Sequence, residues 1–130
     1  MEPARITETR LMDVQDELSA REPIFHRPEH GTTRADFELM MDAEFWEVGA
    51  SGRRYSRAHV LDILEDRQAK PVEENWETRD FFCQEIAPDT YLLSYTLLQD
   101  SRTTHRATLW RRTSEGWNII YHQGTIVESP

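Results

Sequence analysis

The chain has 130 residues and a net charge of −9 at neutral pH, with 38% hydrophobic and 30% charged residues. This length is typical of one domain, and the composition is that of a folded protein rather than a disordered or collagen-like one. The negative charge disfavours binding to nucleic acid or to an anionic membrane surface, because both are polyanions. We therefore expect a single domain over residues 1–130 that has neither partner.

The cysteine count and the N-terminus indicate the cellular compartment. The chain contains one cysteine, Cys83, which excludes an internal disulfide framework and a multi-cysteine metal site. The first ten residues carry four charged side chains and no apolar run, unlike a signal peptide. No stretch reaches the roughly 20 apolar residues that cross a bilayer. These features predict a protein of the reducing cytoplasm.

The first half of the chain predicts helices and a short hairpin. Apolar residues recur at helical spacing over residues 7–21, and Pro23 ends this predicted helix. Thr33 is a suitable cap for a second, short helix. Residues 45–48 then predict a strand, and the glycine-rich residues 49–52 predict a turn that leads into a return strand.

The second half predicts a meander of strands. Ser56 can cap a third helix that ends before Pro71. Beyond it the apolar period changes to two residues, and four strands are predicted over residues 76–86, 91–99, 105–112 and 117–126. The connections are short, so successive strands are expected to be antiparallel neighbours. This order predicts an α+β fold in which helices cover one face of a curved sheet.

Both faces of the predicted strands are apolar. In residues 91–98, the odd-numbered positions are all tyrosine or leucine. The even-numbered positions, which point to the other face, include Leu92 and Leu98. A sheet with one solvent-exposed face alternates more cleanly. Because the helices cover only one face, we expect the other to meet a second copy of the chain; isolated surface aromatic residues are the alternative explanation.

Two local stretches resemble a known family. The first, residues 45–53, reads FWEVGASGR; the second begins with LWRR at residues 109–112 and continues with Gly116, Trp117 and the HQGT of residues 122–125. With the order of elements, they resemble the nuclear transport factor 2-like superfamily, which includes ketosteroid-isomerase-like and SnoaL-like proteins. They look most like a bacterial branch known only as a domain of unknown function (the DUF 4440 type). The resemblance implies a cystatin-like cone, in which a curved antiparallel sheet wraps around N-terminal helices and leaves a pocket at the wide end.

The resemblance also implies a candidate general base. In ketosteroid-isomerase-like relatives a carboxylate at the end of the first strand is the base, and this position falls at Glu47. Aromatic neighbours would raise the pKa of such a carboxylate toward a range useful for proton abstraction. The isomerase pattern is incomplete, since the first tyrosine is Tyr55 and no late-strand acid lies near Thr108. In the structural alternative, Glu47 accepts hydrogen bonds from the 49–52 turn or pairs with Arg53.

Further pocket candidates lie in the late strands. His122 and Gln123 are adjacent, so they point to opposite faces unless a bulge intervenes. In the functional interpretation at least one of them donates into the pocket, with His122 as a second catalytic candidate; in the structural alternative His122 is an interface or edge residue and Gly124 bends the chain. The aromatic candidates for lining the pocket are Trp46, Tyr55, Tyr95 and Trp110. Core packing or a dimer interface is the simpler explanation of these aromatic residues.

No metal or cofactor is predicted. His26 and His30 are four residues apart, but Pro28 between them prevents a regular helical turn. The chain has no glycine-rich phosphate loop. Cys83 is most simply a buried small hydrophobic residue. Arginines gather near the third helix and in the late hairpin, where they could hold an anionic ligand group or balance surface acids.

Three functions are compatible with these features. The preferred one is a pocket protein that binds a small apolar or mildly polar molecule. The second is a cofactor-independent isomerase, dehydratase or hydrolase-like enzyme with Glu47 as base and His122 or Tyr95 assisting. The third is a protein-interaction module for association or immunity, since this fold hosts all three classes. A deep pocket that contains Glu47 would favour the enzyme.

Overall fold

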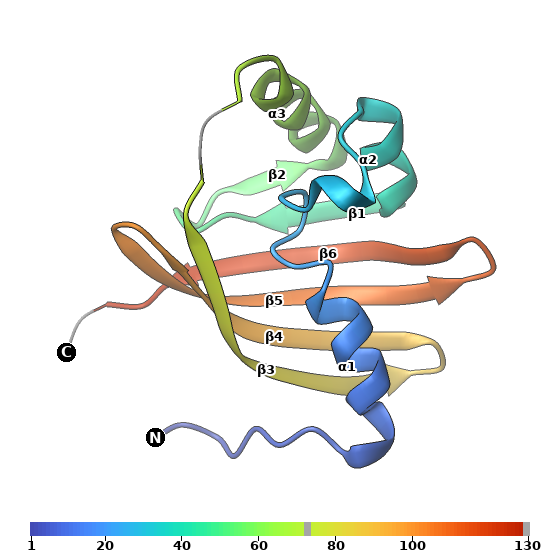
Figure 1. The fold of residues 1–130 in the computed structure, drawn as a ribbon, viewed down its shortest axis with the longest axis vertical. Helices are drawn as coiled ribbons and strands as arrows, with labels where there is room; N and C mark the ends of the chain where they lie inside the picture. The colour runs from blue at the N-terminus through green and yellow to red at the C-terminus, as the bar shows by residue number, and fades with distance from the viewer. Residues whose placement is uncertain (72–73, 129–130) are drawn as a thin grey trace.

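The computed structural model describes residues 1–71 and 74–128, in which helices accompany a curved six-stranded sheet (Figure 1). The helical elements are η1 (Thr9–Leu11), α1 (Met12–Ser19), η2 (Pro28–His30), α2 (Arg34–Met40) and α3 (Arg57–Ala69), where η marks a 3-10 helix. The strands are β1 (Met41–Val48), β2 (Arg54–Ser56), β3 (Trp76–Ala87), β4 (Thr90–Gln99), β5 (Arg102–Thr113) and β6 (Gly116–Ile126). Within the described residues, no helix is long and apolar enough to cross a membrane.

The strands form one sheet in the order β2-β1-β6-β5-β4-β3. Strands β3 to β6 make the predicted meander, each antiparallel to the next, because their connecting turns are short. Strand β1 pairs with β6 in parallel and joins the N-terminal hairpin to this meander. The helices lie on one face of the sheet, which confirms the predicted α+β architecture (Figure 1).

The helix caps follow the predicted chemistry. The Thr33 hydroxyl accepts from the Asp36 amide at 3.1 Å, and the Asp36 carboxylate accepts from the Thr33 amide at 3.1 Å. This reciprocal pair is a capping box at the start of α2. The Ser56 hydroxyl accepts from the His59 amide and caps α3. Both predicted caps are confirmed.

Several predicted boundaries were wrong, among them the start of β5, which lies at Arg102 rather than at residue 105. The first helix begins at Thr9 rather than at residue 7, because the Thr7 hydroxyl instead accepts from the Cys83 amide of β3. Strand β1 begins at Met41 rather than at residue 45. Its first half was not predicted because it includes Asp42, and aspartate is depleted in strands.

The hydrophobic core lies between the helices and the inner face of the sheet, which we define as the face that packs on the helices. Its fully buried side chains include Leu18, Phe37, Phe45, Leu93 and Ile119. The segment after α1 also enters this space, and it buries Glu22 completely. The segment that follows α1 therefore occupies part of the space between the helices and the sheet.

A bulge in β6 decides which late residues reach the inner face. Leu109 of β5 pairs with Tyr121, but the next residue, Trp110, pairs with Ile119. The extra residue in β6 places Ile119 and His122 on the same, inner face despite their odd spacing.

Candidate functional site

Glu47 and His122 lie side by side on the inner face. They are register partners on the parallel strands β1 and β6, and the neighbouring inner residue Phe45 is in the core. Burial raises the pKa of Glu47, while the charges of Arg106 and Arg67 oppose that shift. In the turn that follows β1, the Gly49 amide donates to the Arg53 carbonyl at 2.9 Å. Glu47 is therefore a partly desolvated carboxylate whose pKa is also influenced by two guanidinium charges.

His122 is buried and neutral. Its Nε2 lies 3.4 Å from Nη1 of Arg106, and its Nδ1 lies 2.8 Å from the Thr108 hydroxyl. A guanidinium can only donate, so Nε2 accepts and Nδ1 carries the proton. Burial and the Arg106 charge lower the pKa of His122 to about 3. His122 thus serves to hold Arg106, whose Nε also donates to Thr104.

Tyr95 and Trp110 direct their polar atoms at a buried carboxyl group. Glu22 accepts from the Tyr95 hydroxyl at 2.7 Å, from Trp110 Nε1 at 3.1 Å and from the Ile24 amide at 3.2 Å. Burial raises the pKa of Glu22, and burial and the Glu22 charge raise that of Tyr95 well above its usual value. These two aromatic residues are committed to an internal partner.

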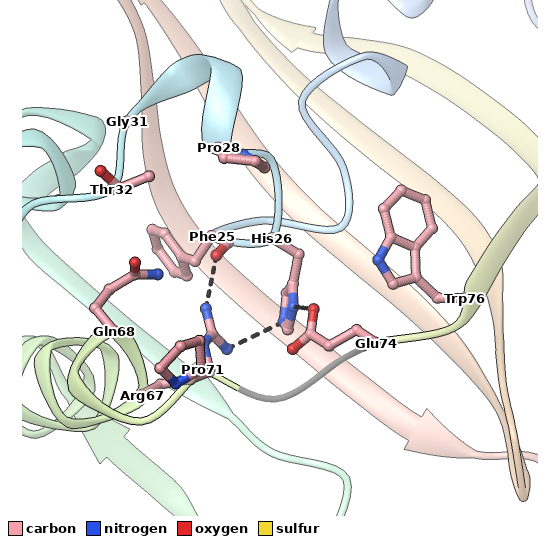
Figure 2. Close-up of a pocket in the computed structure, with 10 residues that line it drawn as sticks. All are labelled: Phe25, His26, Pro28, Gly31, Thr32, Arg67, Gln68, Pro71, Glu74 and Trp76. Carbon is pink, nitrogen blue, oxygen red and sulfur yellow. Dashed lines mark hydrogen bonds and ion pairs between the residues drawn. The ribbon is translucent and has the colours of Figure 1, made fainter.

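A pocket opens at the end of the sheet where β3 begins and β1 and β6 end. It has a volume of about 340 Å³ (Figure 2). We call it the His26 pocket; its lining residues are Phe25, His26, Pro28, Gly31, Thr32, Arg67, Gln68, Pro71, Glu74 and Trp76. They come from the segment between α1 and α2, from the end of α3, from Pro71 and Glu74 between α3 and β3, and from Trp76 at the start of β3.

Three polar side chains form a chain of hydrogen bonds in this pocket (Figure 2). His26 Nδ1 lies 2.6 Å from Glu74 Oε2, and His26 Nε2 lies 3.2 Å from Arg67 Nη1. Arg67 Nη2 also donates to the Phe25 carbonyl at 2.6 Å. Burial and the Arg67 charge lower the pKa of His26, and burial lowers that of Arg67. The guanidinium is held in place before any ligand arrives.

Two aromatic side chains on either side of these groups are also fixed. Phe25 adopts a left-handed backbone conformation with a φ of 66°, which is costly for a bulky residue. Its ring packs edge-on against Phe37, while its carbonyl accepts from Arg67. The guanidinium of Arg27 lies 4.6 Å from the centre of the Trp76 ring. The pocket therefore combines rigid aromatic faces with a few oriented polar groups.

The predicted site residues do not line the His26 pocket. Trp46 and Tyr121 contact each other on the outer face of the sheet, the face opposite the helices, and Gln123 accepts from the Tyr121 hydroxyl there. Tyr55 stacks on His59 near the first hairpin. Glu47 and His122 are neighbours on the inner face, Tyr95 and Trp110 meet at Glu22, and Trp46 and Gln123 both contact Tyr121 on the outer face.

The polar residues of the pocket were not predicted as a site. His26 was weighed only as a metal ligand, while Arg67 and Glu74 lie in no motif and are 41 and 48 residues away from it along the chain. Among the described residues, no group of three or more His, Cys, Asp or Glu side chains could hold a metal ion.

Comparisons with known proteins identify the fold. No protein-family model matches the sequence, and no curated protein matches it, so the expected branch of unknown function is not confirmed. An uncharacterized protein with a cystatin-like fold from Caulobacter vibrioides is similar in structure, with 17% identity, a TM-score of 0.66, and coverage of 88% of this chain and 87% of that one.

Two further solved structures carry names that suggest activities. A proposed dehydratase of the nuclear transport factor 2-like family from Streptomyces avermitilis has 16% identity and a TM-score of 0.68, with 93% and 98% of the two chains covered. A proposed ketosteroid isomerase from Parabacteroides distasonis has 14% identity and a TM-score of 0.63, with 95% and 96% covered. At such identities the likeness shows the fold alone. The chain has the cystatin-like fold of nuclear transport factor 2-like proteins.

Proposed function

We propose that this protein binds a small molecule in the His26 pocket. The observation that carries the proposal is the pocket itself, whose volume of about 340 Å³ lies in the range of roughly 300–1,000 Å³ common for ligand sites. Such sites have aromatic walls and a few converging polar groups, as Phe25, Trp76 and the His26 trio provide here. Arg67 is fixed by two hydrogen bonds, so binding costs little additional ordering of this side chain.

Native mass spectrometry of freshly purified protein tests this proposal. We expect added mass under gentle conditions that disappears on denaturation. Thr32→Trp places a bulky ring at the pocket lining and should remove the added mass. Ser101→Trp, in the exposed turn between β4 and β5, is the matched control and should retain it.

A protein that purifies empty is tested by NMR with a library of small aromatic compounds. Shifts of the backbone amides of His26, Gln68 and Trp76 are the expected result. A bound molecule that survives Thr32→Trp, or a library that shifts none of these amides, would contradict the proposed site.

A second candidate function is a cofactor-independent enzyme of the isomerase, dehydratase or hydrolase-like type. The observation that favours it is Glu47, an inner-face carboxylate beside His122 whose pKa is raised by burial and lowered by the charges of Arg106 and Arg67. A raised pKa suits a general base, and nearby guanidinium groups suit the stabilisation of a developing anion. Arg67 also lines the His26 pocket, and its charge lowers the pKa of Glu47.

Deuterium exchange distinguishes an enzyme from a binding protein. If Glu47 abstracts a proton, the molecule released from the protein should gain deuterium in heavy water when incubated with wild-type protein. Glu47→Gln should abolish the exchange without abolishing binding. Exchange that continues in Glu47→Gln would exclude this residue as the base.

A further inference from the structure

We propose that the His26 pocket selects a neutral, planar aromatic amide, which presents a carbonyl oxygen and an N–H group on one edge. This inference rests on the proposed binding function and specifies its ligand class. It is carried by the charge balance of the pocket, by the donors and acceptors left free in it, and by its aromatic walls.

The charged side chains of the pocket balance one another. Arg67 contributes one positive charge and Glu74 one negative charge, and His26 lies between them. Because Arg67 can only donate, His26 Nε2 must accept, and its Nδ1–H then donates to Glu74. This is the neutral form of the imidazole, in agreement with its lowered pKa. A charged ligand would leave one charge uncompensated in a partly buried site, which is unfavourable.

Donors and acceptors remain free at the two ends of the trio. Arg67 has five N–H donors, and its bonds to Phe25 and His26 use two of them. Glu74 bonds to His26 through Oε2, and among the described residues no hydrogen bond involves its Oε1. Arg67 can therefore donate to an acceptor on the ligand, and Glu74 can accept from a donor on the ligand. An amide offers both, whereas a carboxylate only accepts and an amidinium only donates.

The walls favour a flat molecule. Phe25 and Trp76 both line the pocket and flank the polar trio (Figure 2). The ring of Trp76 is held by Arg27, whose Nε donates to the Glu22 carbonyl at 2.8 Å. Rigid aromatic faces bind planar ligands with little loss of side-chain entropy.

Three probes of nearly equal shape separate these possibilities: benzamide, benzoate and benzamidine. We expect the Trp76 indole N–H signal and the His26 and Gln68 amide signals to shift with benzamide in an NMR titration at pH 7.5. Benzoate and benzamidine should bind at least about fivefold more weakly, since each leaves a pocket group unpaired. This ranking is measured on the wild-type protein, so it does not depend on any variant folding.

Two variants should exchange the preference. Glu74→Gln removes the carboxylate that lines the pocket, so benzoate should gain about tenfold relative to benzamide. Arg67→Gln leaves Glu74 uncompensated, so benzamidine should gain by a similar factor. Arg67→Lys keeps the charge and should keep benzamidine weak. Arg53→Gln and Glu115→Gln, both exposed and outside the pocket, should leave the ranking unchanged.

The outcomes separate the two proposals. Binding of benzoate or benzamidine in preference to benzamide, with shifts at the same signals, would overturn the amide class and leave the small-molecule function standing. The same preference in Glu74→Gln and Arg67→Gln as in wild type would also overturn it. If no probe shifts any pocket signal while the Thr32→Trp test shows a molecule bound there, only the amide class fails. If both tests are negative, the pocket has neither role.

Discussion

The burial of Glu22 follows from its three hydrogen bonds. A carboxyl group without water around it is tolerated when its oxygens accept from several donors, and here Tyr95, Trp110 and the Ile24 amide provide them. The raised pKa of Glu22 shows that burial outweighs these bonds in its effect on ionisation. Glu22 therefore organises the interior rather than the pocket.

Removal of this acceptor should be more costly than removal of one donor. Glu22→Ala leaves the Tyr95 hydroxyl and the Trp110 N–H unpaired in the core, so we expect the free energy of unfolding to fall by about 2–5 kcal/mol. Tyr95→Phe removes one hydrogen bond, at a cost of about 1 kcal/mol. Urea denaturation followed by tryptophan fluorescence measures both. Glu29→Ala, exposed in the same loop, is the control. Equal stability of Glu22→Ala and wild type would contradict this account.

His122 should make the folded state sensitive to acid. Its pKa falls from 6.5 to about 3 on folding, so below pH 6.5 the unfolded chain binds a proton that the folded chain does not. Stability is then lost as the pH falls, by about 2 kcal/mol between pH 7.5 and pH 5. Burial lowers the pKa of His26 in the same direction and adds to the loss.

His122→Gln should flatten this dependence. The variant is expected to be less stable than wild type at pH 7.5, because it alters the bonds to Thr108 and Arg106, but to lose less stability between pH 7.5 and 5. Urea unfolding at four pH values in this range measures the slope. A variant at position 122 with an unchanged slope would disprove the assignment.

The positions of individual residues could be predicted from the sequence to different degrees. Glu47 could be placed on the inner face because strand alternation and the Phe45 neighbour fix its direction. The burial of Glu22 could not be predicted, because an acidic residue before a proline is typical of an exposed helix end. Arg67 and Glu74 carry no local signal at all, since they meet His26 only after α3 and β3 have packed around the loop.

At the scale of elements, local chemistry predicted the caps and turns but not the bulge. Thr33 and Ser56 cap helices through bonds that span three residues, so their sequence context is sufficient. The extra residue of β6 depends on pairing with β5 along the whole strand. Without the bulge, His122 would share a face with Ile120; with it, His122 reaches the inner face beside Glu47.

Gly31 joins the capping box of α2 to the His26 pocket. Its φ is 138°, and a Cβ there would lie 2.5 Å from Cβ of Asp36. We expect Gly31→Ala to lower the free energy of unfolding by more than about 2 kcal/mol, because both the backbone and the cap are strained. Gly52→Ala is a matched control: its φ is 89°, but nothing lies within 4 Å of the added Cβ, so it should cost only about 1 kcal/mol. Urea denaturation compares them, and equal costs would rule out the clash with Asp36.

At the scale of the whole molecule, the two faces of the sheet differ in what covers them. The inner face packs on the helices, whereas a groove of about 470 Å³ crosses the outer face over β4, β5 and β6. Leu92, Ala107, Leu109 and Tyr121 contribute to it. Nearby, Arg5 of the N-terminal segment donates to Ser94 and to the Asp80 carbonyl. Apolar grooves of this kind commonly mark interaction surfaces.

We propose that a second copy of the chain covers this outer face, as the apolar pattern of both strand faces predicts. Sedimentation should then give about twice the chain mass of 15.4 kDa. Leu109→Glu puts a charge in the middle of the groove, and its burial against a partner would be costly, so this variant should sediment as a monomer with an unchanged circular dichroism spectrum. Leu39→Glu, at a leucine that is 73% exposed on α2, should remain a dimer. A monomeric wild type, or a Leu109→Glu variant that stays dimeric, would refute pairing through this face. The exposed aromatic residues would then be ordinary features of a monomer surface.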